Sequence, residues 1–150
     1  MDITERLRQE HNDIQNMFSE LMNSQIEDAE SYGKKVIDLM IKLEGHERAE
    51  EQTIYAQLQT DLDVRPIALQ AMEEHRVARM LMRDLADLEV TEELWLPKLV
   101  VANNIVSLHV QIEEGNVLPL IEQMLSDEDR SKLDRDYESA ERTMIQQLRS

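Results

Sequence analysis

The spacing of apolar residues constrains the fold of this chain more than any other feature. In four long segments, apolar side chains recur every three or four residues, as Leu7, Ile14, Phe18 and Leu21 do in the first. This spacing places them along one face of an α-helix. Only three glycines and three prolines occur among the 150 residues, which leaves few turn residues for a many-stranded β fold. The sequence therefore predicts an all-α protein.

Capping and turn residues indicate where the first helices begin and end. Asp2 or Thr4 is placed to cap the first helix, which is expected to end at a turn formed by residues 23–25. The second helix is expected to begin after Ser24 or Asp28. Its apolar face indicates that it continues without interruption to the acidic turn near residue 60.

Proline and glycine place the boundaries of the later helices. Pro66 is expected to be the first residue of a third helix, and Pro97 to lie in the first turn of a fourth. Gly115 and Pro119 predict a kink near the end of the fourth helix, because proline has no backbone donor.

Four long amphipathic helices with short connections pack most simply as an up-down antiparallel four-helix bundle. The bundle is expected over about residues 2–123, followed by a short, highly charged C-terminal helix at about residues 127–148. A chain of this length forms one domain. We therefore expect residues 1–150 to be a single domain.

Composition excludes several classes of partner. The chain has 32 acidic and 16 basic residues, a net charge of −16, so it repels phosphate backbones and anionic lipid. We expect neither nucleic-acid binding nor membrane attachment. No cysteine is present, which excludes disulfides, thiolate metal sites and thiol nucleophiles. The first residues lack the basic and apolar regions of a secretory signal, so a cytoplasmic protein is expected.

The chain has four histidines, and one lies on the apolar face of each long predicted helix. Two of them are followed four residues later by a glutamate, a spacing at which side chains point the same way from a helix. Imidazole is a good ligand for iron, zinc and copper, and a carboxylate can bridge two ions. The candidate metal ligands are His11, His46, Glu50, His75, His109 and Glu113.

The sequence around these residues repeats after about 64 positions. Glu10-His11 corresponds to Glu74-His75, and residues 46–51 (HERAEE) correspond to residues 109–114 (HVQIEE). A duplicated helix pair of this kind places its ligands around a pseudo-twofold axis. Such an arrangement favours a site for two metal ions.

A simpler interpretation of each histidine is a hydrogen-bonded core residue, and a metal-free structural bundle is the corresponding alternative for the whole chain. Burying four imidazoles and two carboxylates without a metal costs several kcal/mol for each group. No cationic residue is expected to offset that cost. The set as a whole therefore favours metal binding.

With these residues the sequence resembles the hemerythrin-like cation-binding proteins, known as the HHE family. The resemblance also includes residues 113–120 (EEGNVLPL) and covers nearly the whole chain. It implies a hemerythrin-like metal-binding domain with a non-haem diiron centre, in which two iron ions are oxo- or hydroxo-bridged. By this resemblance Glu50 and Glu113 are bridging carboxylates and the four histidines terminal ligands. Manganese and zinc are alternative metals for the same residues.

The sequence departs from the oxygen-carrying hemerythrins at two positions. Arg79 stands where those proteins have a further histidine, and His109-x-x-x-Glu113 replaces a His-x-x-x-x-Asp pair. One imidazole fewer leaves the metal pair open to exogenous ligands and disfavours reversible oxygen carriage. A ferritin-type site is also disfavoured, because such sites use Glu-x-x-His spacing.

Two functions remain open at this point. The first is a protein that binds or reacts with dioxygen, nitric oxide or peroxide, for sensing, detoxification or iron-centre repair. If it is an enzyme, it is a diiron oxidoreductase acting on one of these small molecules. The second is a non-catalytic iron-binding module for iron sensing, delivery or storage.

Overall fold

The computed structural model describes residues 1–23 and 28–150. In these ranges the chain forms helices and no strand. The elements are α1 (Ile3–Asn23), α2 (Ala29–Gln52), α3 (Ile54–Gln59), α4 (Arg65–Ala86), α5 (Trp95–Ile112), the π-helical turn η1 (Glu113–Val117), α6 (Leu118–Met124) and α7 (Asp127–Arg149). Ser24 and Gln25, where a turn is expected, lie outside the described residues. Asp28 caps α2 by accepting a hydrogen bond from the backbone N–H of Ser31 at 2.7 Å.

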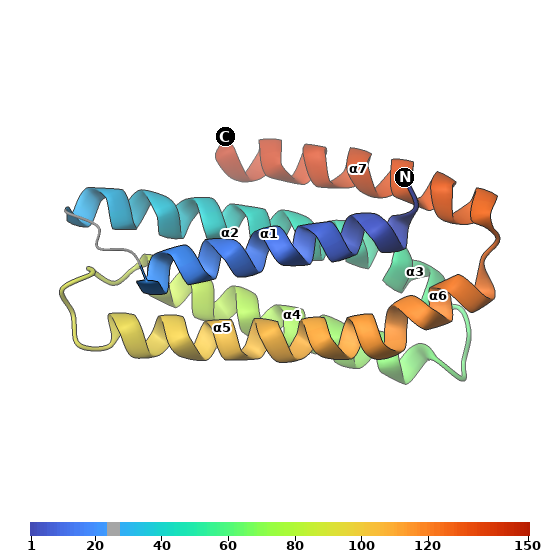
Figure 1. Cartoon of the computed structure of the whole chain (residues 1–150), viewed down its shortest axis with the longest axis horizontal. Helices are drawn as coiled ribbons and strands as arrows, with labels where there is room; N and C mark the ends of the chain where they lie inside the picture. The colour runs from blue at the N-terminus through green and yellow to red at the C-terminus, as the bar shows by residue number, and fades with distance from the viewer. Residues whose placement is uncertain (24–27) are drawn as a thin grey trace.

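The long helices form the expected up-down antiparallel bundle (Figure 1). Successive helices α1, α2, α4 and α5 run in alternating directions, with α3 extending α2 and α6 extending α5. The C-terminal helix α7 lies outside this bundle and packs along α2 and α1. The predicted all-α fold with an additional C-terminal helix is confirmed.

The capping predicted for α1 is provided by Asp2. Its Oδ1 accepts hydrogen bonds from both the backbone N–H and the hydroxyl of Thr4, each at 2.7 Å. A cap of this kind stabilises a helix by about 1 kcal/mol, because it satisfies one of the free N–H groups of the first turn. Pro66 lies in the first turn of α4, which begins one residue earlier than predicted.

The second predicted helix is not continuous, and the expectation of an uninterrupted helix is wrong at Thr53. This residue has φ −117° and ψ −86°, so α2 ends at Gln52 and α3 begins at Ile54. The hydroxyl of Thr53 donates to the carbonyl oxygen of Ala49 at 2.7 Å, one turn earlier. A threonine side chain that bonds to the backbone in this way competes with the helical ladder and bends the helix.

The end of α5 is irregular as well, near the position that Gly115 and Pro119 predict. Residues Glu113–Val117 form a π-helical turn, in which the N–H of Leu118 donates to the carbonyl oxygen of Glu113. A single π turn inserted in an α-helix is often a functional feature. The break at Thr53 comes three residues after Glu50, and the π-helical turn begins at Glu113, so both irregular segments lie at the ends of the His-x-x-x-Glu pairs of the sequence repeat.

The C-terminal helix α7 has 23 residues, so it is not the short helix that the sequence was expected to form. Ser126 caps it by accepting from the N–H of Asp129 at 3.1 Å, and ion pairs such as Lys132–Asp136 at 2.9 Å support its exposed face. Only Asp134 and Tyr137 are buried along its length. Leu133 and Ala140 of the same helix are partly buried and pack against the core.

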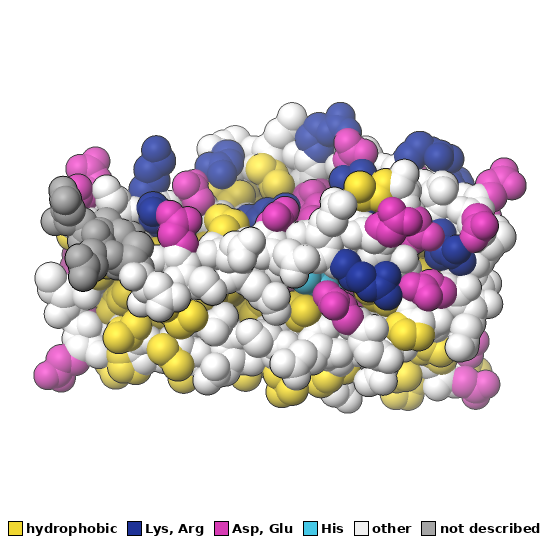
Figure 2. All heavy atoms as spheres, viewed as in Figure 1, with side chains coloured by type: hydrophobic (Ala, Val, Ile, Leu, Met, Phe, Trp, Pro, Cys, Tyr) yellow, Lys and Arg dark blue, Asp and Glu magenta, His cyan; other side chains and the backbone are white. Residues whose placement is uncertain are grey.

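The core consists of two apolar clusters with a layer of buried polar residues between them. One cluster surrounds Phe18, Leu39 and Met82, and the other surrounds Leu7 and Tyr55. None of the helices in the described ranges is long and apolar enough to cross a membrane. Figure 2 shows one face of the molecule. On this face, charged side chains lie over α1 and α7, and apolar side chains lie along the edge formed by α5.

Candidate metal centre

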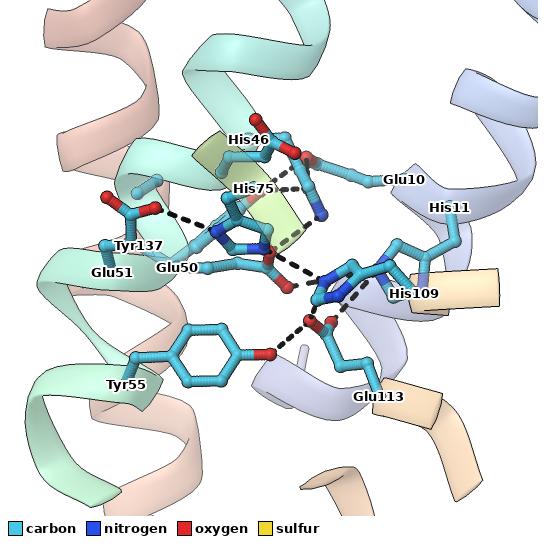
Figure 3. Close-up of polar contacts among 12 residues, drawn as sticks. Glu10, His11, His46, Glu50, Glu51, Tyr55, His75, His109, Glu113 and Tyr137 are labelled. Atoms are coloured by element: carbon cyan, nitrogen blue, oxygen red, sulfur yellow. Dashed lines mark hydrogen bonds and ion pairs between the residues drawn. The ribbon is translucent and has the colours of Figure 1, made fainter. Parts of the chain in front are cut away.

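All six predicted ligands lie together in the polar layer of the bundle (Figure 3). His109, the most exposed of the six, has only 7% of its surface accessible. The centre therefore draws on every helix of the bundle. The residues come from α1 (His11), α2 (His46 and Glu50), α4 (His75), α5 (His109) and η1 (Glu113).

Glu50 lies between the two pairs of histidines. Its Oε1 is 3.2 Å from Nε2 of His46 and 3.3 Å from Nε2 of His75, and its Oε2 is 3.9 Å from Nε2 of His11. The carboxylate thus contacts imidazoles from both halves of the sequence repeat. This is the position that a bridging ligand requires.

Glu113 occupies the equivalent position on the opposite side of the layer. Its Oε1 is 3.1 Å from Nε2 of His11, and its Oε2 is 3.1 Å from Nε2 of His109. The imidazole rings themselves form two close pairs, with ring centroids 5.0 Å apart for His11 and His46 and 4.5 Å apart for His75 and His109.

These contacts define two overlapping groups of four residues. Within each group, one ligand atom per residue lies within 4.8 Å of all the others. Donor atoms that lie about 2.1 Å from a metal ion at right angles to each other are roughly 3 Å apart, which matches the separations above. The first tetrad is His11, His46, Glu50 and Glu113, and the second tetrad is Glu50, His75, His109 and Glu113.

Several buried polar atoms at the centre lie near an opposing group but make no well-oriented hydrogen bond. Among the described residues these atoms are Nε2 of His11, both carboxylate oxygens of Glu50 and Oε1 of Glu113. A buried unpaired polar group costs about 1–3 kcal/mol, and more when it is charged. One cation in each tetrad would remove this cost, so the residues fit a two-metal site.

The other nitrogen of each imidazole, Nδ1, faces a second set of glutamates. An Nδ1–H that donates to a carboxylate leaves the Nε2 lone pair available to a metal and fixes the orientation of the ring. The sequence pattern did not indicate this role. The pairs are His11–Glu114 at 2.6 Å, His46–Glu10 at 3.0 Å, His75–Glu51 at 2.8 Å and His109–Glu74 at 2.6 Å.

These partners follow the pseudo-twofold repeat of the sequence. Glu10 and Glu74 each precede a histidine and bond to the histidine of the following long helix. Glu51 and Glu114 each follow a candidate bridging glutamate and bond to a histidine of the other half. Each ring is therefore held by residues whose positions are equivalent in the two halves.

A cation does lie beside the centre, contrary to the expectation that none offsets the buried acids. Nη1 of Arg79 is 3.1 Å from Oε2 of Glu51 and 3.5 Å from Oε1 of Glu47. Glu47 is fully enclosed, and burial raises its pKa to about 7. Arg79 thus stabilises acids around His75 from the position at which the oxygen carriers are expected to have another histidine.

Electrostatics hold the imidazoles and carboxylates together. Burial lowers the pKa of each histidine, but the neighbouring carboxylates outweigh it and raise the pKa of His11 to about 11, of His109 to about 10, and of His46 and His75 to about 9. Burial likewise opposes ionisation of Glu50, yet the surrounding imidazoles lower its pKa. The centre is therefore preorganised to balance negative carboxylates with positive charge.

Tyr55 is a further residue of the centre that the sequence pattern did not indicate. Its hydroxyl donates to Oε2 of Glu113 at 2.5 Å. Burial raises the pKa of Tyr55 well above its ordinary value, and the charges of Glu113 and Glu50 raise it further, so the hydroxyl keeps its proton. Tyr55 lies in the segment predicted as the second helix, five residues after Glu50. This short distance from Glu50 was the only feature of the sequence that could have indicated it.

A pocket of about 150 Å³ lies beside Tyr55, His109 and Glu113. Apolar side chains form much of its wall, so it suits a small, weakly polar molecule. The remaining lining residues are Ile67, Gln70, Ala71, Glu74, Ile112, Asn116 and Val117.

Comparisons with known proteins agree with this geometry. No curated protein and no solved structure gave a significant match to the chain. The family model of the hemerythrin HHE cation-binding domain matches residues 2–121, which span the helices that carry all six predicted ligands. The chain therefore belongs to the hemerythrin HHE cation-binding family.

Proposed function

We propose that this chain is a non-haem diiron protein that binds or reacts with dioxygen, nitric oxide or peroxide. The observation that carries the proposal is the pair of tetrads, which share Glu50 and Glu113. His11 and His46 would hold one ion and His75 and His109 the other, with Glu50 and Glu113 shared by both tetrads. When bound, a pair of iron ions supplies Lewis acidity and electrons for the reaction of a small ligand.

The donor set supports iron. Imidazole and carboxylate are ligands that iron accepts readily, whereas structural zinc sites are usually closed tetrahedra rich in cysteine and histidine. Bridging carboxylates between imidazole pairs are typical of diiron centres in helical bundles. Manganese and zinc remain the alternative metals for the same residues.

The residues around the centre support a site that admits a small ligand. Each tetrad has four protein residues, which leaves positions free on an octahedral ion. Arg79 does not close such a position, because its Nη1 is engaged by Glu51 and Glu47. The pocket beside Tyr55 and His109 provides space for a molecule of a few atoms.

The chain's own groups control polarity and protons in that space. The apolar walls would limit the number of water molecules near the ions. Electrostatic interactions within the pocket would then be stronger than in bulk water. The Tyr55 hydroxyl keeps its proton beside Glu113, within the lining of the pocket, where it can donate a hydrogen bond to a bound ligand. This arrangement favours a ligand that accepts a hydrogen bond, such as a peroxide.

A non-catalytic iron-binding module is the second candidate. The unsatisfied atoms of Glu50 and Glu113 favour it, because metal loss leaves buried acids unpaired and loosens the bundle. The functional output would then be the change in folding when metal binds, rather than turnover of a substrate.

The test is metal content and reactivity of untagged protein purified from iron-supplied medium. We expect two irons per chain by elemental analysis, and spectral changes on anaerobic addition of nitric oxide or on mixing with dioxygen or peroxide. Glu113→Gln should lower the iron content, whereas Glu122→Gln, an exposed residue on α6, should leave it unchanged. Two irons without any reaction would favour the second candidate. No metal after anaerobic addition of ferrous iron would overturn the proposal.

A further inference from the structure

The C-terminal helix contributes a residue to the surroundings of the candidate metal centre. Tyr137 of α7 is completely buried, and its hydroxyl oxygen lies 2.7 Å from Nδ1 of His46 and 2.6 Å from Oε1 of Glu10 (Figure 3). The family match ends at residue 121, so this contact comes from outside the matched region. The hydroxyl of Tyr137 therefore reaches the centre from an element that the family assignment does not explain.

The contact distinguishes His46 from the other three histidines. Each imidazole has one glutamate at Nδ1, but within residues 1–23 and 28–150 only His46 also has a hydroxyl at that atom. Tyr137 donates its proton to Glu10, so its oxygen accepts from Nδ1–H of His46, which it shares with Glu10 as a second acceptor at 3.0 Å. This direction leaves Nε2 of His46, 3.2 Å from Oε1 of Glu50, as the nitrogen available to a metal.

Other groups pack around this contact and complete its charge balance. Nζ of Lys42 lies 3.5 Å from Oε1 of Glu10 and 3.6 Å from Oε2 of Glu141, and the Tyr137 hydroxyl lies 3.3 Å from the same Glu141 oxygen. The cluster thus links α1, α2 and α7 around the Tyr137 hydroxyl.

The helices α2 and α7 approach closely beside His46. A Cβ atom added to Gly45 would lie 2.7 Å from Cγ1 of Ile145, so only glycine permits the observed packing. Away from the metal centre, Arg6 anchors the same helix through Asp134, with Nε 2.5 Å from Oδ1. The backbone of α7 is therefore held at the distance that the Tyr137 contact requires.

We propose that Tyr137 is a positioning residue for His46, which couples the docking of α7 to metal binding in the first tetrad. The inference rests on the proposed function, because it requires His46 to be a metal ligand. Tyr137 fixes the tautomer and the orientation of the ring before the metal binds. Conversely, a metal on Nε2 holds the ring and so strengthens the attachment of α7.

Tyr137→Phe tests the proposal, because it removes one oxygen and keeps the ring. Ferrous iron is titrated anaerobically against a competing chelator, and cobalt(II) is used as a spectroscopic probe. One of the two ions should bind about 10- to 100-fold more weakly, the other should be unaffected, and the cobalt ligand-field bands should shift. Wild-type affinity for both ions together with an unchanged cobalt spectrum would overturn the inference and leave the diiron proposal intact.

Two control variants separate positioning from general loosening. Tyr32→Phe makes the same chemical change at a tyrosine that packs on Trp95, with ring centroids 5.3 Å apart, away from the centre. Asp134→Asn weakens the attachment of α7 to Arg6 without touching His46. Both should retain the wild-type cobalt spectrum, because the Tyr137 hydroxyl remains at His46. Tyr32→Phe should also keep both iron affinities, whereas Asp134→Asn should bind the same ion slightly more weakly, as the coupling requires. The same spectral shift in Asp134→Asn would show that helix attachment, not the hydroxyl, is responsible.

Hydrogen exchange of the wild-type protein provides a test that needs no variant to fold. Amides of α7 should exchange more slowly when ferrous iron is bound than in the metal-free protein. Equal exchange in α7 with and without bound iron would contradict the coupling. Failure of the wild-type protein to bind any metal would overturn both this inference and the proposed function.

Discussion

Nδ1 of His11 lies 2.6 Å from Oε2 of Glu114, while Nε2 of the same ring lies 3.1 Å from Oε1 of Glu113. Two consecutive residues of the π-helical turn therefore contact both nitrogens of one imidazole. Glu50 and Glu51 do the same for His75, with distances of 3.3 and 2.8 Å. In each case an inner carboxylate faces the candidate metals and its neighbour orients the ring.

Glu114→Gln should weaken metal binding without unfolding the protein. The amide can still accept from His11, but it lacks the charge that makes the imidazole a strong ligand, so the affinity for one ion should fall by about 10- to 100-fold. Chelator competition with ferrous iron under anaerobic conditions measures this change. Glu128→Gln, an exposed residue at the start of α7, is the control and should bind both ions as the wild type does. Unchanged affinity in Glu114→Gln would mean that this contact does not orient the ligand.

Removing the metal should lower the free energy of unfolding. Binding of one ion to the native state alone stabilises it by about 2.7 kcal/mol when the free ion is 100-fold above its Kd, and a second ion adds to this. The physical reason is the set of unsatisfied buried atoms on His11, Glu50 and Glu113. Urea unfolding with chelator and with anaerobic ferrous iron measures the difference. Identical unfolding curves would show that the centre is a metal-free polar core.

Asp2 should give a stability contribution that depends on pH. Burial raises its pKa, but hydrogen bonds from Arg130 and Thr4 outweigh this effect and lower the pKa below its ordinary value of 3.8. The contribution is therefore present above pH 3.8 and is lost as the pH falls through the lowered pKa of the folded state. Asp2→Asn keeps a capping oxygen but loses the charge that faces Arg130, so it should cost at most about 1 kcal/mol near neutral pH, and less in acid. Urea unfolding of both proteins from pH 3 to 7 measures this; a difference that grows in acid would contradict the assignment.

Glycine-to-alanine substitutions at two positions of α2 should have opposite effects. Gly33 has nothing within 4 Å of an added Cβ, so Gly33→Ala should stabilise the helix by about 0.5–1 kcal/mol. At Gly45 the same helical gain is opposed by the contact with Ile145, and such overpacking costs typically about 1–3 kcal/mol. Gly45→Ala should therefore destabilise the protein. Urea unfolding of the two variants measures both changes in the free energy of unfolding. Stabilisation by both substitutions would show that Ile145 and α7 can shift at little cost.

The sequence predicts the helices and the burial of the six candidate ligands, because both depend on local periodicity. His11, for example, continues the apolar face defined by Leu7 and Ile14, so its inward direction follows from helix geometry alone. The break at Thr53 was missed, because a side-chain bond to Ala49 has no signature in the apolar pattern.

Contacts between distant segments were also beyond the sequence pattern. Tyr137 is an apolar position of the predicted C-terminal helix, but nothing in the sequence indicates that its hydroxyl meets His46, 91 positions away. Arg79 was identified as a departure from the oxygen carriers, but its pairing with Glu47 and Glu51 depends on how α2 and α4 pack. Such pairings require the three-dimensional arrangement of the helices.

The crossed hydrogen bonds of the repeat make the two halves of this chain mutually dependent. Glu114 of the second half orients His11 of the first, and Glu51 of the first half orients His75 of the second. A single helix pair cut from the chain would keep two histidines and one carboxylate, yet lose the partner of one imidazole and one bridge. Only by pairing with a second copy of itself could it complete a centre.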